Sequence, residues 1–157
     1  MTAKVLSLQK GWRWCRKCEG LFFIGNFFKW RCPAEGLHDH NGSGFYQLQL
    51  APPGQPYWRR CRKCEGLFFN ANLAAVLSFG RCPVAGGGNV NIHEPVLQTE
   101  YFLNINNFFG GLSSQSGWRW CQKCEGIFFS GNATNGRCAA GGSHNGLNSG
   151  NYNLLME

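Results

Sequence analysis

The sequence has little charge, no long apolar run and almost no helical spacing. Only 15% of its 157 residues are Asp, Glu, Lys or Arg, below the quarter or so of an average soluble domain. No apolar run approaches the ~18 residues of a membrane span, and residues 1–10 lack the apolar centre and cleavage site of a signal peptide. Only Asn72–Ser78 fits a helical turn. We therefore expect a β-rich protein that is made in the cytoplasm, with leaderless export as the alternative.

Glycine, aromatic residues and cysteine are abundant instead. The chain has 22 Gly, 13 Phe, 6 Trp and 9 Cys, and 43% of its residues are hydrophobic. A disordered chain would have fewer aromatic residues and more charge. This composition favours short strands joined by tight turns around a real core.

One motif occurs three times in the chain. It reads Trp-Arg-Trp/Arg-Cys-x-Lys-Cys-Glu-Gly-Leu/Ile-Phe-Phe, and it is followed by an Arg-Cys pair, a histidine and a closing Tyr-x-Leu. We define repeat 1 as residues 11–50, repeat 2 as 57–104 and repeat 3 as 117–156, within a single domain of residues 1–157. Internal repeats of this kind indicate a repeated structural unit.

Each repeat is expected to contain four short strands, with Lys29–Cys32 and Phe45–Leu50 as the last two in repeat 1. Three such units predict an all-β fold with pseudo-threefold symmetry. A β-trefoil is the first choice, a β-prism the second and a string of independent modules the third. A unit of about 40 residues is near the size below which metals or disulfides are needed for stability.

The cysteines divide as three per repeat, an odd number that cannot pair fully within one repeat. Structural zinc takes four S or N ligands, and Cys₃His is one of its standard sets. The alternatives are buried free thiols or a redox pair, and the latter lacks its βαβ context. We therefore predict three zinc ions per chain. The predicted ligands are Cys15, Cys18, Cys32 and His38; Cys61, Cys64, Cys82 and His93; Cys121, Cys124, Cys138 and His144.

Two details of these sites can be predicted. The Cys-x₅-His spacing shared by repeats 1 and 3 selects His38 over the neighbouring His40. Gly20 and its equivalents follow the Cys-x₂-Cys turn, where we expect a positive φ.

Zinc also changes the charge of the protein. Nine thiolates and three divalent ions lower the formal charge from +7 to about +4. A basic residue precedes the second and the third Cys of every repeat, and cations beside thiolates stabilise them. These bases are Lys17, Lys63 and Lys123, and Arg31, Arg81 and Arg137.

Several resemblances follow from these motifs. The Cys-x₂-Cys-x-Gly turn resembles the zinc knuckle of zinc ribbons, which implies a metal and no particular function. A Trp before Cys-x₂-Cys with an Asn downstream resembles RNA-binding fingers of the Ran-binding-protein type, but their second Cys-x₂-Cys is absent here. The whole unit resembles a repeat of uncharacterised bacterial proteins. The threefold layout is similar to that of β-trefoil lectins, by fold analogy alone.

These features favour a non-enzymatic recognition module that binds carbohydrate or another surface ligand at several sites. Catalysis is not expected, because four protein ligands would close each zinc site. The alternative is a zinc-finger-like protein that binds single-stranded nucleic acid through Arg13, Arg16 and Arg62. Candidate ligand-binding residues are Asn26, Trp30, Asn72 and Asn132. The candidate loops are Asn26–Lys29, Asn72–Phe79 and Asn132–Gly136, with Asp39–Ser43 and Asn145–Ser149. Plain turn chemistry accounts equally well for the Asn and Gly residues.

Overall fold

The computed structural model describes residues 7–26, 30–71, 80–84, 91–106 and 112–157. Within these ranges the protein is all-β and has no α-helix, which confirms the all-β part of the predicted fold. No helix in the described ranges is long and apolar enough to span a membrane. The helical turn expected at residues 72–78 lies outside them.

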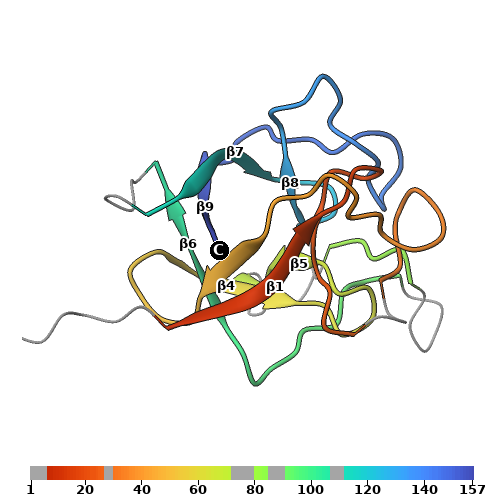
Figure 1. Ribbon diagram of the computed structural model, residues 1–157. Helices are drawn as coiled ribbons and strands as arrows, with labels where there is room; N and C mark the ends of the chain where they lie inside the picture. The colour runs from red at the N-terminus through yellow and green to blue at the C-terminus, as the bar shows by residue number, and fades with distance from the viewer. Residues whose placement is uncertain (1–6, 27–29, 72–79, 85–90, 107–111) are drawn as a thin grey trace, which may run out of the picture.

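Every repeat contributes a first strand, a three-residue second strand and a closing strand. The strands are β1 (Leu8–Trp14), β2 (Leu21–Phe23) and β3 (Tyr46–Gln49); β4 (Gln55–Arg60), β5 (Leu67–Phe69) and β6 (Tyr101–Ile105); β7 (Ser114–Trp120), β8 (Ile127–Phe129) and β9 (Tyr152–Met156). The loops between second and closing strands extend to the right of the strands in Figure 1.

The third of the four strands expected in repeat 1, Lys29–Cys32, is wrong in its described part, Trp30–Cys32. Only an isolated bridge, Arg31 to Leu37, forms there. The chain turns instead, because Cys32 N–H donates to Gly36 O and Glu35 N–H donates to Cys32 O. This turn curls the backbone around the Cys32 sulfur.

Antiparallel pairing closes the sheet almost completely. In each repeat the first strand pairs with both the second and the closing strand. The closing strands β3, β6 and β9 then pair with one another in a ring. Bridges also join β2, β5 and β8, through Gly20–Phe128, Phe22–Gly66 and Phe68–Gly126. The result is a nearly closed, barrel-like sheet.

The core is built from four equivalent positions of each repeat. They are Trp12, Leu21, Tyr46 and Leu48; Trp58, Leu67, Tyr101 and Leu103; Trp118, Ile127, Tyr152 and Leu154. Each Trp meets the Tyr of a different repeat edge to face, with Trp12 and Tyr101 having ring centroids 5.2 Å apart. Gln9 accepts hydrogen bonds from both of these rings, and the pattern recurs around the barrel. Neighbouring repeats therefore complete one another's core.

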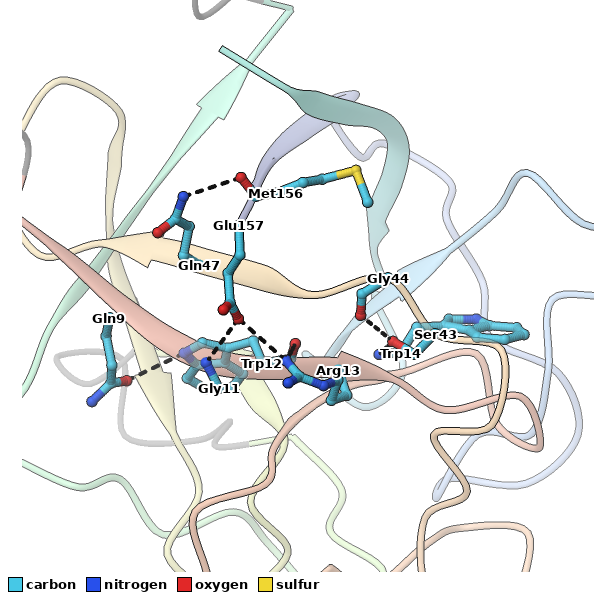
Figure 2. A network of polar contacts seen from close by, with 10 residues as sticks. All are labelled: Gln9, Gly11, Trp12, Arg13, Trp14, Ser43, Gly44, Gln47, Met156 and Glu157. Atoms are coloured by element: carbon cyan, nitrogen blue, oxygen red, sulfur yellow. Dashed lines mark hydrogen bonds and ion pairs between the residues drawn. The ribbon is translucent and has the colours of Figure 1, made fainter.

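The last residues of the chain meet repeat 1 at one seam, shown in Figure 2. Gln47 of β3 donates to Met156 O of β9 at 3.1 Å. The Glu157 carboxylate accepts a hydrogen bond from Gly11 N–H and forms an ion pair with Arg13, both at 3.4 Å. Repeat 3 is thereby joined to repeat 1.

Candidate metal centres

Three cysteines and one histidine of each repeat come together in a buried cluster. The ligand atoms of a cluster all lie within 4.8 Å of one another. The first two cysteines come from the turn between the first and second strands, and the third cysteine and the histidine come from the following loop. The clusters are Cys15, Cys18, Cys32 and His38; Cys61, Cys64, Cys82 and His93; Cys121, Cys124, Cys138 and His144.

The spacing of the ligand atoms fits one tetrahedral ion per cluster. The first and third sulfurs are 3.8, 3.8 and 3.9 Å apart in the three repeats, and the second sulfur lies 3.5 to 3.6 Å from histidine Nδ1. A tetrahedral site with metal–sulfur bonds of ~2.3 Å and metal–nitrogen bonds of ~2.0–2.1 Å has edges of ~3.8 and ~3.5 Å. A disulfide would need ~2.05 Å, and all nine cysteines are free. The clusters are therefore compatible with metal binding.

The Cys-x₂-Cys turn differs in one respect from the expectation. The residue with positive φ is Glu19 (φ 65°), as also at Glu65 and Glu125 (both 66°), and the following glycine is not in that region. Gly20 gives room to the sulfur, because a Cβ there would lie 3.3 Å from Cys18 Sγ, a tight contact. Its N–H donates to the same sulfur at 3.4 Å. The expected positive φ at glycine is thus wrong by one residue.

Backbone amides surround the sulfurs in repeat 1. Besides Gly20, Ala34 N–H donates to Cys32 Sγ and Asp39 N–H donates to Cys15 Sγ, both at 3.4 Å. Hydrogen bonds to the charged form of a group favour that form. Repeats 2 and 3 have equivalent bonds, so the backbone is arranged to stabilise thiolates.

Neighbouring thiols also shift one another's pKa. Hydrogen bonds from Cys18 and Cys32 lower the pKa of Cys15. The hydrogen bond between Cys15 and Cys18, that with Cys32, and burial raise the pKa of Cys18. A bound cation would therefore have to displace protons from the cluster, which makes metal binding dependent on pH.

The histidine rings are held from two sides. His38 stacks on Phe22 with centroids 4.4 Å apart, and the other two repeats have the same stack. His144 Nε2 lies 3.0 Å from Cys18 O of repeat 1, a contact that orients a ligand whose Nδ1 faces the metal. His40 is exposed and stands edge-on to Trp30, 5.7 Å between centroids. It does not belong to the cluster.

The other predicted site residues have structural contacts. Trp30 is 7% exposed and packs beside the repeat 1 cluster, so only a small part of its surface faces solvent, and its role in ligand binding stays a prediction. Asn26 Nδ2 donates to Glu65 at 3.2 Å, and Asn132 Nδ2 donates to Glu19 at 2.7 Å. Asn72 lies outside the described residues.

Two surface pockets lie beside the cluster histidines of repeats 1 and 3. The first, of about 560 Å³, is lined by Trp30, Leu37, His38, Asp39, His40, Asn41, Gly42, Ser43 and Phe45. The second, of about 490 Å³, includes His144, Asn145, Gly146 and Leu147. The first contains the candidate loop Asp39–Ser43, and the second contains residues 145–147 of the candidate loop Asn145–Ser149.

Comparison of the chain with protein-family models, curated proteins and solved structures found no match. Function must therefore be inferred from the chemistry of these sites.

Proposed function

We propose that the protein is a zinc-stabilised recognition module that binds carbohydrate without catalysing a reaction. Three thiolates and one imidazole are a donor set that suits zinc, and we propose one zinc ion per repeat, three per chain. With four protein ligands, no coordination position is open to a substrate, which supports a structural role for the metal. The threefold barrel-like sheet supports a β-trefoil-like arrangement.

Two pockets at corresponding loops are the observation that carries the proposal; they share the repeat positions of residues 37–41 and 143–147. Each pocket starts at the metal-binding histidine and continues along a loop fixed by its own side chain. Asp39 Oδ1 accepts from Asn41 N–H, and Asn145 Oδ1 accepts from Leu147 N–H, both at 3.0 Å. In each loop the proposed metal ligand, His38 or His144, thus fixes the first residue, and the hydrogen bond to the Asp39 or Asn145 side chain fixes the residues that follow.

The chemistry of the pockets suits a sugar. Phe45 is 57% exposed and Leu147 is 66% exposed, and each lies beside amide or hydroxyl side chains of its pocket. Sugars have both apolar C–H faces and hydroxyl groups, so such mixed pockets match them. Two pockets on one rigid body could also bind a branched or repeated glycan with avidity.

Nucleic acid has less support as the ligand. The arginines that would bind phosphates already have partners: Arg13 pairs with Glu157, Arg16 with Asp39 and Arg62 with Glu94. These pairs reduce the free positive charge that single-strand binding needs.

A glycan array with the zinc-loaded protein tests the proposal. We expect specific signals that Asn41→Ala and Phe45→Ala reduce. Leu97→Ala is the matched control, because Leu97 is 67% exposed and lies in neither pocket. A parallel gel shift at two salt concentrations tests the alternative, since phosphate contacts weaken steeply with salt. Tight, salt-sensitive binding of RNA or DNA without a glycan signal would overturn the carbohydrate proposal.

A further inference from the structure

A small cavity lies between the three metal clusters. Equivalent residues of all three repeats line it, including the second ligand cysteine and the ligand histidine of each: Cys18, Cys64, Cys124, His38, His93 and His144. Because each repeat contributes the same positions, the cavity lies on the pseudo-threefold axis. Its volume of about 40 Å³ is enough for a few water-sized groups.

This axial cavity continues into a wider pocket of about 270 Å³. The two share Arg31, Pro33, Pro83 and Ala139 as lining residues. Arg81 lines the inner cavity and Arg137 lines the outer pocket. One exposed arginine from each repeat, always the residue before the third ligand cysteine, therefore lines the inner cavity, the outer pocket or both. We call this connected space the opening.

These three arginines have no ion pair or side-chain hydrogen bond within the part of the chain that the structure describes. By contrast, Arg16 and Arg62 each contact a carboxylate at 2.6 to 2.7 Å. The outer pocket does contain one carboxylate, that of the exposed Glu35. The opening thus has three guanidinium groups against a single acidic side chain.

The negative charge of the zinc-loaded clusters does not neutralise the positive charge of these arginines. A Zn²⁺ with three thiolates and a neutral histidine carries a net charge of −1, so three loaded clusters carry three negative charges. The lysine before each second cysteine supplies three positive charges near the same clusters. Lys17 Nζ donates to Glu35 O at 2.6 Å and Lys123 Nζ to Gly141 O at 2.5 Å. The arginines remain in excess by two charges after Glu35 is counted.

One histidine that lines the inner cavity has an unpartnered ring nitrogen among the described residues. His38 is 8% exposed, and its Nε2 has no hydrogen-bond partner among the described residues. When Nδ1 binds a metal, Nε2 carries the proton of the neutral ring and becomes a donor. His144 Nε2, by contrast, lies within hydrogen-bond distance of Cys18 O. Only the Nε2 of His38 is therefore without a partner in this pair of histidines.

We propose that Arg31, Arg81 and Arg137 form a binding site for a tetrahedral oxyanion, such as phosphate, free or as the ester group of a larger ligand. Guanidinium groups match the oxygens of such anions with paired N–H donors. Three of them around a threefold axis can each take a different oxygen. The site is distinct from the pockets at Asp39 and Asn145, and its existence does not depend on carbohydrate binding there.

Calorimetric titration of the zinc-loaded protein with inorganic phosphate at low ionic strength tests the proposal. We expect saturable binding that falls at least about tenfold in Arg31→Gln/Arg137→Gln, since hydrogen bonds to charged groups are lost. The matched control is Arg16→Gln/Arg62→Gln, which removes the same charge elsewhere; repeat 3 naturally has Gln122 at that position. We expect the control to change affinity less than about twofold. No saturable binding, or an equal loss in both variants, would overturn the proposal.

A second measurement keeps the test valid if the axial variant does not hold its zinc. Arginine-specific modification of the wild-type protein, read by mass spectrometry, should show phosphate protecting Arg31, Arg81 and Arg137 but not Arg16 or Arg62. Uniform protection, or none, would overturn the proposal. Glucose 6-phosphate, titrated in parallel, separates the two sources: tighter binding than phosphate indicates an ester ligand, and equal binding indicates the free ion. Zinc content measured afterwards verifies that phosphate has not removed the metal.

Discussion

Glu19 of repeat 1 accepts two hydrogen bonds from the side-chain amide of Asn132 in repeat 3, at 2.7 and 3.0 Å. The carboxylate is buried and also accepts a hydrogen bond from Trp14 Nε1 at 2.6 Å. Glu19 directly follows a predicted metal ligand, and its own carbonyl accepts from Phe129 N–H. The metal-binding turn and the contact between repeats are therefore one structural unit.

Asn132→Ala should lower the free energy of unfolding by about 1–3 kcal/mol, because a buried carboxylate loses donors. Asn26→Ala is the matched variant, since Asn26 makes the equivalent bond to Glu65. We expect a smaller loss there, because Glu65 keeps its ion pair with Arg60 at 2.5 Å. Denaturant unfolding of both variants measures the difference. A larger loss in Asn26→Ala would contradict this account of the interface.

Metal content is the most direct test of the three clusters. Elemental analysis should find about three zinc ions per chain, and Cys18→Ser should leave two. His38→Ala should likewise lose one ion, whereas His40→Ala should keep all three, because His40 lies outside the cluster. A strong chelator should lower Tm sharply, since metal binding and folding are coupled in small modules. Equal zinc loss in both histidine variants, or metal-free protein with oxidised thiols, would refute the assignment.

Gly136 should tolerate no side chain. A Cβ there would lie 2.2 Å from Cys18 O, in the backbone of another repeat's metal-binding turn. Gly136→Ala should therefore cost several kcal/mol (about 2–4) of stability through overpacking and strain. Gly141→Ala separates the two causes: its φ of 97° is also positive, but nothing lies within 4 Å of the new Cβ. Thermal unfolding measures both variants. If they lose equal stability, backbone strain from the positive φ alone accounts for the loss.

The core tyrosines should make stability depend on alkaline pH. Burial raises the pKa of Tyr101 and of Tyr152 to about 12, against ~10 in an unfolded chain. The contribution of these raised pKa values to the free energy of unfolding is fully present below pH ~10. It is lost as the pH rises from there through ~12, because the phenols of the unfolded chain ionise first. Denaturation midpoints measured across this window should fall. Tyr152→Phe should show a shallower fall, and an unchanged slope would argue against the raised pKa of Tyr152.

The clusters could be predicted from the sequence because their ligands recur at corresponding positions in each repeat. A cysteine pair on one turn is a local feature, and the shared Cys-x₅-His spacing distinguished His38 from His40. The all-β class could be predicted for a similar reason, since short apolar and aromatic segments separated by Gly and Asn recur in each repeat. Neither inference required knowledge of contacts between distant residues.

The structural contacts of Asn26, Asn132 and Trp30 could not be predicted, because they depend on residues elsewhere in the chain. Their polar or aromatic character suits a ligand site, but the partner of Asn132 is 113 positions away at Glu19. Trp30 occupies the position of Gly80 and Gly136 in the other repeats, and its burial follows from packing on Phe22. The misassigned strand at 30–32 has a related cause, because the turn around Cys32 depends on backbone contacts that its strand-like residues do not reveal.

Closure of the sheet by its last strand has a consequence for synthesis on the ribosome. Gln47 and Met156 are partners 109 positions apart, so most of the chain has been translated before β3 can complete its pairing. Until β9 emerges, β3 and β6 have unpaired backbone groups of the kind that recruit other chains. A premature stop codon after repeat 2 should therefore yield an aggregating fragment rather than a smaller working protein. The complete chain, dominated by such distant pairings, should fold late and slowly.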